Sequence, residues 1–348
     1  MVNSPFVSII IPCRNEKTYI AACLDSAAAT DYPKDKIEIL VADGMSDDGT
    51  RETLQSYVRK YPFIRALDNA KRVTPSALNV AIRQAGGDVI LRLDAHAKYP
   101  PDYVRKSVDA LYESGADNVG GIRRTEPRTK TRIAYAIAFS VSSPFTAGNA
   151  LYRTGTKSRR WVDTVFCGCY RKEVFQRIGL FNESLVKTQD REFNQRLRDA
   201  GGKILLDPAI ECTYYARSGY LEYCRWMLQI GSWPFIGSKL AGRRFFSIRN
   251  FVPLAFVLGL STALCGSWWL LSMRWVLLVI AVTYLASSIA AATPLATEKR
   301  DPSYLIVAPF VFATTHILYG IGSLYGILKP VSVGAIEAAQ GDACRKAS

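Results

Sequence analysis

Two potential metal ligands, Asp94 and His96, follow an apolar run of strand length, residues 89–93. A buried strand that stops at an acid can present polar side chains in the crevice outside a sheet, where open α/β folds bind ligands. A carboxylate and an imidazole can hold Mg²⁺ or Mn²⁺, and the imidazole tilts the choice toward Mn²⁺. A strand with a solvated polar cap is the alternative that this stretch alone leaves open.

Polar side chains also follow two earlier apolar runs. Asn15 and Glu16 come after residues 7–12, and Asp43 comes after residues 37–42. Acceptors of this kind can bind the base N–H and the ribose hydroxyls of a nucleotide, and a hard cation can bridge its diphosphate and stabilise the charge that develops as it leaves. The turn after Asp43 is rich in Asp and Gly, a composition that is also common in solvated turns without a ligand. A solvated turn is therefore the alternative for this loop.

A third candidate, Asp190, lies in the first turn of a predicted helix over 188–202, which has glycine at its end. A carboxylate held at a helix start beside a cleft can take a proton from an attacking hydroxyl. The helix dipole favours Asp190 and Glu192 at this place in any protein, so stabilisation of the helix is the alternative.

The elements that must position these residues alternate between strand and helix. Two β-turn-α units in the first 60 residues and a third behind them predict an α/β fold with a mainly parallel sheet, in which strand ends converge on one crevice. The stretch 121–160 is rich in Arg, Lys, Ser, Thr and Gly, and we expect it to be a long loop that borders the acceptor side of the site. Strands are predicted near 7–12, 37–42, 64–67, 89–93, 116–120 and 162–170, and helices near 16–29, 50–61, 74–84, 102–114, 171–179 and 188–202.

The C-terminal part contains three long apolar runs, 251–272, 275–297 and 303–328, without charge except for His316. Each reaches the roughly 20 residues that a membrane-spanning helix needs, although buried core helices are the alternative. The preceding segment, 216–250, mixes aromatic and basic residues, as helices in a membrane interface do. We therefore expect a globular domain over 1–215, interfacial amphipathic helices over 216–250, a transmembrane region over 251–328 and a tail over 329–348.

Nearly all of the net charge of +14 precedes the first apolar run. Arg243, Arg244 and Arg249 lie just ahead of it, so the positive-inside tendency predicts that residues 1–250 are cytosolic and that the tail lies on the other side. The N-terminus has no basic leader and is not expected to be a signal peptide. The charge suits anionic lipid or a phosphorylated substrate; without a recognisable nucleic-acid module, no nucleic-acid partner is expected. The eight cysteines have no zinc-ligand spacing.

Five motifs in order carry a family resemblance. The chain resembles the inverting family 2 glycosyltransferases of the GT-A fold, and it looks most like the membrane-bound succinoglycan-type glucosyltransferases because of its DAH, its NVGG at 118–121 and its SIRNFVPLAFV. The resemblance covers about residues 5 to 330. The five motifs are VSIIIPCRNE, VADGMSDDGT, DVILRLDAHAKYP, FCGCYRKEVFQRIGLFNE and TQDREFNQRLRDAGGKI.

This resemblance implies roles for individual residues. Asp190 would be the base that deprotonates the acceptor hydroxyl for a single displacement with inversion, while Glu192 and Arg196 would orient that base or the phosphates. Asp94 and His96 would occupy the place of the metal-binding acids. Since the usual aspartate is missing at His96, either His96 binds metal itself, which we favour, or Asp94 holds it with water and phosphate. The donor nucleotide pocket would be lined by Pro12, Asn15, Glu16, Asp43 and Asp94.

The expected protein is a membrane-anchored, metal-dependent hexosyltransferase in the bacterial inner membrane. It would move a hexose, with glucose favoured, from a UDP-sugar to a saccharide on a polyprenyl diphosphate at the cytosolic face, for exopolysaccharide repeat-unit assembly. A processive synthase is one alternative, since Glu222 to Trp226 resembles a QxxRW element with Glu for Gln, but three spans are few for a channel. A catalytically silent membrane scaffold is the other.

Overall fold

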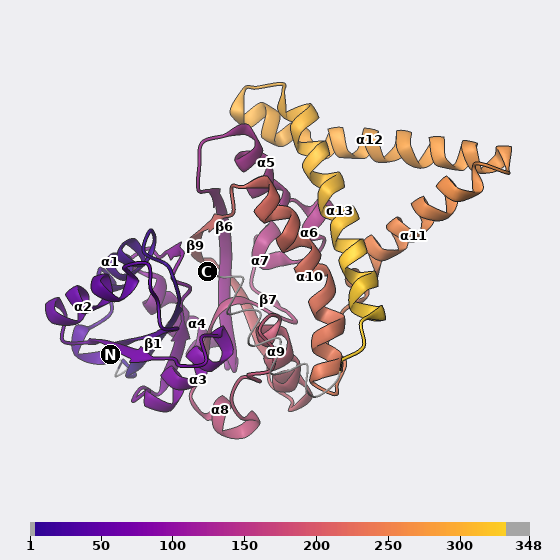
Figure 1. Cartoon of the computed structure of the whole chain (residues 1–348). Coiled ribbons are helices and arrows are strands. Elements are labelled where there is room, and N and C mark those ends of the chain that lie inside the picture. The colour runs from indigo at the N-terminus through magenta and orange to yellow at the C-terminus, as the bar shows by residue number, and fades with distance from the viewer. Residues whose placement is uncertain (1–3, 332–348) are drawn as a thin grey trace. The chain divides into compact units, whose positions relative to one another are not determined.

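The computed structural model describes residues 4–331 and divides into two compact units (Figure 1). The described part of unit 1 comprises residues 4–124 and 155–214. Unit 2 comprises residues 125–154 and 215–331. Unit 1 therefore contains every residue that the sequence singles out for chemistry, and unit 2 contains the apolar runs.

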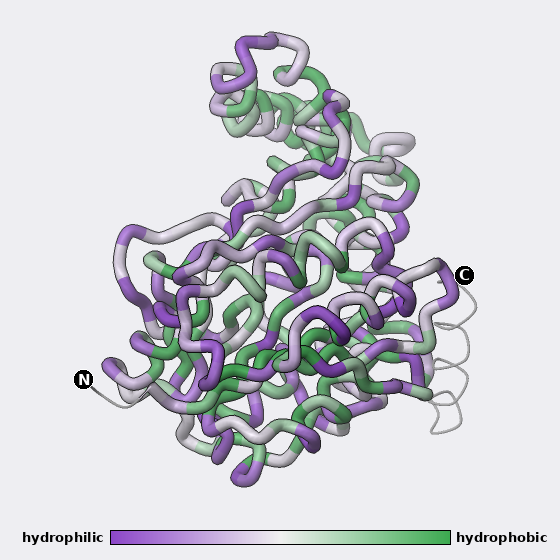
Figure 2. The backbone as a smooth tube through the Cα atoms, turned by 90° about the vertical axis from the view of Figure 1, so that its left-hand side faces the viewer, coloured by the Kyte–Doolittle hydropathy of each residue, from purple (hydrophilic) through white to green (hydrophobic). Residues whose placement is uncertain are grey.

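One half of the sheet in unit 1 is parallel. Runs of β-branched residues form its inner strands, which are coloured as hydrophobic in Figure 2 and are buried on both faces, as strands of a parallel sheet are. Helices connect them, and the order is β3-β2-β1-β4. The strands are β1 (Val7–Cys13), β2 (Ile37–Asp43), β3 (Ile64–Asp68) and β4 (Val89–Arg92), and the helices are α1 (Ile20–Ala28), α2 (Thr50–Lys60) and α3 (Thr74–Gln84), with a 3-10 turn at Lys34–Lys36.

The other half is antiparallel, so the sheet as a whole is mixed. The α/β class is confirmed, and the parallel arrangement that the sequence predicts holds for the first four strands in the chain. β8 (Phe166–Arg171) pairs antiparallel with β4 and with β6 (Asn118–Pro127). Gly121 faces the Ile210 carbonyl, where a Cβ would overlap it, so glycine permits this close approach. The remaining elements are β5 (Ala97–Lys98), β7 (Arg160–Trp161), β9 (Ile204–Ala216), α4 (Tyr103–Ser114), α8 (Glu173–Ile178) and α9 (Gln189–Asp199).

The stretch 121–160, predicted to be a long loop, contains three short helices. They are α5 (Arg132–Ser140), α6 (Pro144–Ala147) and α7 (Leu151–Thr154). Thr131 and Ser143 cap α5 and α6, since their side chains accept hydrogen bonds from backbone N–H groups in the first turn. Ala136 and Ile137 of α5 are fully buried in a core cluster of unit 2. The prediction of a loop was wrong here because burial against distant residues stabilises these helices, and the local composition does not show that burial.

Unit 2 is built around α13, against which the other long helices pack. Gly322 and Gly326 lie against backbone carbonyls of α10, and an added Cβ at either glycine would overlap the carbonyl of Leu228 or Ser232. Small residues at a helix interface allow this approach, as in membrane proteins. The helices are α10 (Tyr220–Leu240), α11 (Phe251–Gly266), α12 (Leu271–Lys299) and α13 (Tyr304–Leu328), with a 3-10 turn at Ile248–Asn250.

Three of these helices, at 248–266, 271–299 and 304–328, are long and apolar enough to cross a membrane, and they fall on the three predicted runs. Pro253 of α11 packs against Gly320 of α13, and Leu295 of α12 packs in a cluster with Tyr304. α11 and α12 meet at a turn away from α13 (Figure 1), where Trp268 is 79% exposed. The predicted interfacial segment 216–250 contains α10. Most of the predicted tail lies outside the described residues.

Candidate active site

The ends of β1, β2 and β4 lie side by side at one edge of the sheet. In the parallel register Cys13 pairs with Asp43, and Ile10 pairs with Arg92. The polar residues that follow these strands are therefore neighbours, although they are up to 80 positions apart in the chain. Pro12 lies within β1, opposite Ala42.

Asp43 holds the loop that follows β2. Its side chain is buried, and it accepts hydrogen bonds from Ser46 N at 3.0 Å and from Arg51 Nη1 at 2.8 Å. Arg51 also pairs with Asp68 at 2.8 Å, which links α2 to β3. The carboxylate thus fixes the shape of the loop at the edge of the crevice.

Asn15 joins this loop to the end of β1. Its φ is 52°, a left-handed conformation that asparagine tolerates better than most residues. Its Nδ2 donates to Asp47 Oδ1 at 2.9 Å, and its backbone N–H donates to Ser46 Oγ at 2.8 Å. Two loops that are distant in sequence therefore form one wall.

Asp94 is paired with the last residue of β4. Arg92 Nη2 lies 2.8 Å from Asp94 Oδ1, and both side chains are 13% exposed. Burial alone would raise the pKa of Asp94, but the Arg92 guanidinium and His96 hold it below its ordinary value. Asp94 is therefore a carboxylate at neutral pH.

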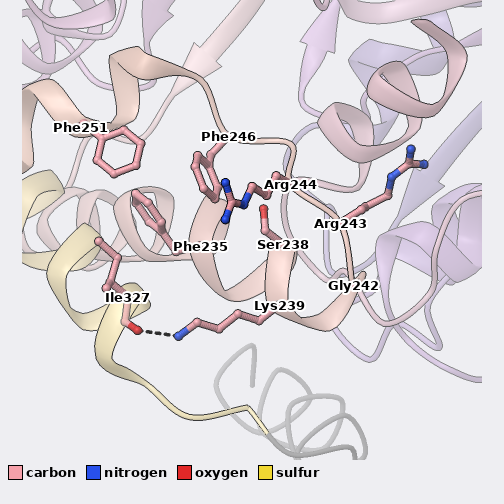
Figure 3. A pocket seen from close by; sticks show the side chains of 9 residues that line it. All are labelled: Phe235, Ser238, Lys239, Gly242, Arg243, Arg244, Phe246, Phe251 and Ile327. Carbon is pink, nitrogen blue, oxygen red and sulfur yellow. Dashed lines mark hydrogen bonds between the residues drawn. The ribbon is translucent and has the colours of Figure 1, made fainter. Parts of the chain in front are cut away.

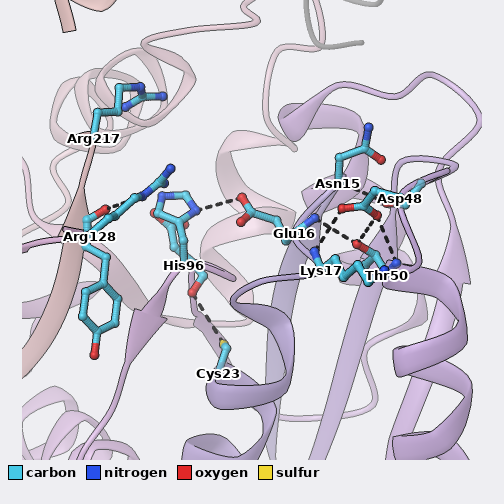
Figure 4. Close-up of polar contacts among 12 residues, drawn as sticks. Asn15, Glu16, Lys17, Cys23, Asp48, Thr50, His96, Arg128 and Arg217 are labelled. Carbon is cyan, nitrogen blue, oxygen red and sulfur yellow. Dashed lines mark hydrogen bonds and ion pairs between the residues drawn. The ribbon is translucent and has the colours of Figure 1, made fainter. Parts of the chain in front are cut away.

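His96 is paired with Glu16 (Figure 4). Nδ1 lies 3.0 Å from Glu16 Oε1, and the ring packs edge-on against Tyr214 at 5.1 Å between centroids. Burial would lower the pKa of His96, but the hydrogen bond to Glu16 raises it to about 9. In this arrangement Glu16 binds His96, and the imidazole has to lose a proton before it can coordinate a metal.

The site offers two protein ligands for a divalent metal. Within residues 4–331 there is no group of three or more His, Cys, Asp or Glu side chains that could hold a metal ion. Asp94 Oδ2 and His96 Nε2 form no hydrogen bond with other residues of that part of the chain. A lone pair of Asp94 Oδ2 is therefore available, and Nε2 gains one when the imidazole loses its proton. Mg²⁺ and similar ions are often bound through one or two side chains with water and substrate phosphates completing the shell, so the pair fits such an ion.

Asp190 lies in the first turn of α9, where Oδ1 accepts a hydrogen bond from Arg191 N at 2.9 Å. Burial would lower the pKa of Arg92, but the negative charges of Asp94 and Asp190 raise it. Because such an effect falls off with distance, the fold brings Asp190 into the electrostatic neighbourhood of the guanidinium that also holds Asp94.

Glu192 and Arg196 form a bidentate pair on the same helix. Arg196 Nε and Nη2 lie 2.6 and 3.0 Å from the two Glu192 oxygens, and Glu192 is 2% exposed. Arg196 also donates to the carbonyls of Ile178 and Leu180. These contacts connect the end of α8 and the loop after it to α9. They therefore help to fix the orientation of the helix that carries Asp190.

Sequence reasoning missed two features of the site. Arg92 was read as part of an apolar strand, although a charged residue inside such a run, two positions before an acid, was a signal for an ion pair. A buried amide chain was also missed, in which Asn118 Nδ2 donates to Asn194 Oδ1 at 3.0 Å and Asn194 Nδ2 donates to Thr164 Oγ1 at 2.9 Å. It fastens α9 to β6.

Two relatives match the chain over nearly its full length. The chain is 28% identical to the succinoglycan biosynthesis protein ExoA of Rhizobium meliloti (strain 1021), over 90% of this chain and 92% of that protein. It is also 28% identical to the dolichyl N-acetyl-alpha-D-glucosaminyl phosphate 3-beta-D-2,3-diacetamido-2,3-dideoxy-beta-D-glucuronosyltransferase of Methanococcus voltae, over 93% of this chain and 98% of that protein.

A solved structure, the mannosyltransferase PcManGT from Pyrobaculum calidifontis in complex with GDP-Man and Mn²⁺, shares the fold. The TM-score is 0.59 at 21% identity, covering 94% of this chain and 88% of that one. Residues 8–179 match the model of glycosyl transferase family 2. That segment runs from β1 to the end of α8, and it includes the ends of β1, β2 and β4. The chain therefore carries a glycosyl transferase family 2 domain over residues 8–179, with the GT-A fold, followed by three candidate membrane-spanning helices.

Proposed function

We propose that the protein is an inverting, metal-dependent hexosyltransferase that uses a UDP-sugar, with glucose as the favoured hexose. The observation that carries this proposal is the placement of two pairs, Asp94 with Arg92 and His96 with Glu16, at the neighbouring ends of β1 and β4. The negative charge of Asp190 also acts on Arg92 and raises its pKa. A pair of metal ligands beside a third carboxylate suits a donor diphosphate next to an acceptor hydroxyl. The wall formed by Asn15 and Asp43 would bind the nucleoside, next to Pro12 and Glu16.

Asp94 and His96 would hold a divalent ion, whose positive charge would stabilise the leaving UDP. Arg92 holds the Asp94 carboxylate in place. Asp190 takes the proton from the acceptor hydroxyl, whose oxygen then attacks the anomeric carbon from the side opposite the diphosphate. One displacement of this kind inverts the configuration. The contacts of Glu192 and Arg196 position α9 and therefore Asp190.

The proposed acceptor is a saccharide on a polyprenyl diphosphate in exopolysaccharide repeat-unit assembly. The three candidate spans support a membrane location, and the names of relatives include a dolichyl phosphate-linked substrate, an undecaprenyl phosphate-linked one and succinoglycan biosynthesis. The catalytic domain, 1–215, would be cytosolic at the bacterial inner membrane. Arg243, Arg244 and Arg249 just before the first span support that orientation.

The test is a transfer assay with the purified full chain and a panel of UDP-sugars, GDP-mannose and lipid-linked acceptors, with analysis of the product linkage. Asp190→Asn should lower transfer by about 10²-fold or more while UDP binding persists. Asp199→Asn, an exposed acid at the end of the same helix, is the matched control and should transfer normally. Normal transfer by Asp190→Asn would remove the base role. Long polymer from UDP-sugar alone would identify a processive synthase, and no turnover with any donor would identify a silent scaffold.

A further inference from the structure

A cavity of about 590 Å³ lies at the corner of unit 2 where α10 ends, α11 begins and α13 ends (Figure 3). Its lining combines large apolar side chains with small, polar and basic residues. The apolar residues are Phe235, Phe246, Phe251 and Ile327, and the others are Ser238, Lys239, Gly242, Arg243 and Arg244.

The local sequence explains how the corner forms. Gly242 follows α10 with φ 62°, and the N–H groups of Gly242 and Arg243 donate to the carbonyls of Lys239 and Ser238 at 3.3 and 3.2 Å. This pair of bonds with glycine after the last helical residue is a Schellman motif, which stops a helix and reverses the chain. The reversal places Arg243 and Arg244 at the cavity immediately after α10.

Three aromatic rings form the apolar wall. The centroid distances are 5.1 Å between Phe235 and Phe246, 5.4 Å between Phe235 and Phe251, and 5.5 Å between Phe246 and Phe251. The rings come from the end of α10, from the link and from the start of α11. This wall suits hydrocarbon.

The helix ends and the link that form the corner supply basic side chains and no carboxylate. Lys239 Nζ donates to the backbone carbonyls of Gly326 and Lys329, at 3.1 and 2.9 Å, and to that of Ile327 between them. These bonds join the ends of α10 and α13 without cancelling the charge. No Asp or Glu occurs in residues 223–297 or 304–329. Arg244 is exposed and forms no hydrogen bond or ion pair with the residues that the structure describes.

We propose that this cavity binds the phosphate diester headgroup of an anionic phospholipid from the surrounding bilayer. The Arg244 guanidinium binds the phosphate, and the Phe235, Phe246 and Phe251 wall receives the first carbons of the chains. A bilayer lipid fits because the cavity opens where one candidate span begins and another ends, which is the level of the headgroups. The lipid would fasten unit 2 to the anionic face of the membrane.

The test is lipid titration of the purified full chain in detergent, followed by native mass spectrometry, with phosphatidylglycerol, phosphatidylcholine and undecaprenyl phosphate. We expect wild type to bind phosphatidylglycerol more tightly than phosphatidylcholine, and Arg244→Gln to weaken that binding about fivefold, from roughly 1 kcal/mol per basic residue at an anionic surface. The control is Arg274→Gln, which removes the same charge at the turn between α11 and α12, where Arg274 Nε donates to Ser267 O. It should bind as wild type does.

A second variant tests whether lipid binding needs the cavity itself or only the positive charge of the surface. Phe246→Ala keeps every basic residue but opens the apolar wall, so it should also weaken phosphatidylglycerol binding, with folding checked by thermal unfolding. Unchanged binding in Phe246→Ala or in Arg244→Gln, or an equal loss in Arg274→Gln, would overturn the proposal. Displacement by inorganic phosphate, or a clear preference for undecaprenyl phosphate, would also overturn it, by identifying a free anion or the carrier lipid as the occupant.

Discussion

Replacing Arg196 by methionine should destabilise unit 1 strongly. The substitution keeps much of the side-chain volume but leaves the Glu192 carboxylate, whose side chain is 3% exposed, without its cation. The Ile178 and Leu180 carbonyls lose their donor as well. Breaking a buried pair by removing one partner costs about 3–5 kcal/mol, because the other charge stays buried. For a domain of this size that corresponds to a fall in Tm of roughly 6–20 °C.

The assay is thermal unfolding of the full chain in detergent at neutral pH, followed by circular dichroism. Arg198→Met is the control, since Arg198 is exposed on the same helix and should change Tm little. The double variant Glu192→Gln with Arg196→Met should recover part of the loss, because no unpaired charge remains buried. A Tm for Arg196→Met equal to that of Arg198→Met would refute the reasoning, and so would a double variant less stable than Arg196→Met.

Three further predictions concern other parts of the chain. Gly322→Val should separate α10 from α13 and lower Tm, because its Cβ would overlap the Leu228 carbonyl, whereas Gly259→Ala, with open space at its Cβ, should keep or raise it. Burial would raise the pKa of Glu183, but Lys71 at 2.7 Å and Asn79 at 2.9 Å hold it below its ordinary value. This pairing therefore stabilises the fold fully above the unfolded-state pKa of about 4.3, and its contribution is lost as pH falls through the lower folded-state pKa. Lys71→Met should lower Tm at neutral pH but not in strong acid. A difference in Tm that does not change with pH would contradict this. Removing divalent metal with EDTA should weaken UDP-sugar binding measured by calorimetry, and adding Mn²⁺ should restore it. Asp94→Asn should bind the UDP-sugar equally with and without Mn²⁺. Binding by wild type that does not depend on metal would argue against the proposed ligands.

The parallel half of the fold was predictable because its signals are local. β-branched runs that stop at polar residues gave β1, β2 and β4, and α3 was predicted at the bounds that the structure has, with Pro75 in its first turn. The adjacency of Asn15, Asp43 and Asp94 then followed from the rule that parallel strand ends meet at one edge.

The rest depended on contacts between distant segments. β8 inserts between β4 and β6, and nothing in residues 162–170 specifies those neighbours. The contact of Glu16 with His96, 80 positions later in the chain and 3.0 Å away, was not predicted. α5 was missed because its helical state depends on burial against distant parts of unit 2. Such pairings arise from packing, which a local pattern does not encode.

The cavity corner also limits how often the chain can cross a bilayer. Phe251, at the start of α11, and Ile327, at the end of α13, line the same cavity, and Lys239 bonds the backbone at Lys329. A chain that enters the membrane at one face and finishes at that face makes an even number of crossings, whereas three single crossings would end at the opposite face. If this corner lies at one face of the membrane, Val331 is on the same face as Arg249. A reporter fused after Val331 should therefore be active as cytosolic green fluorescent protein and inactive as exported alkaline phosphatase.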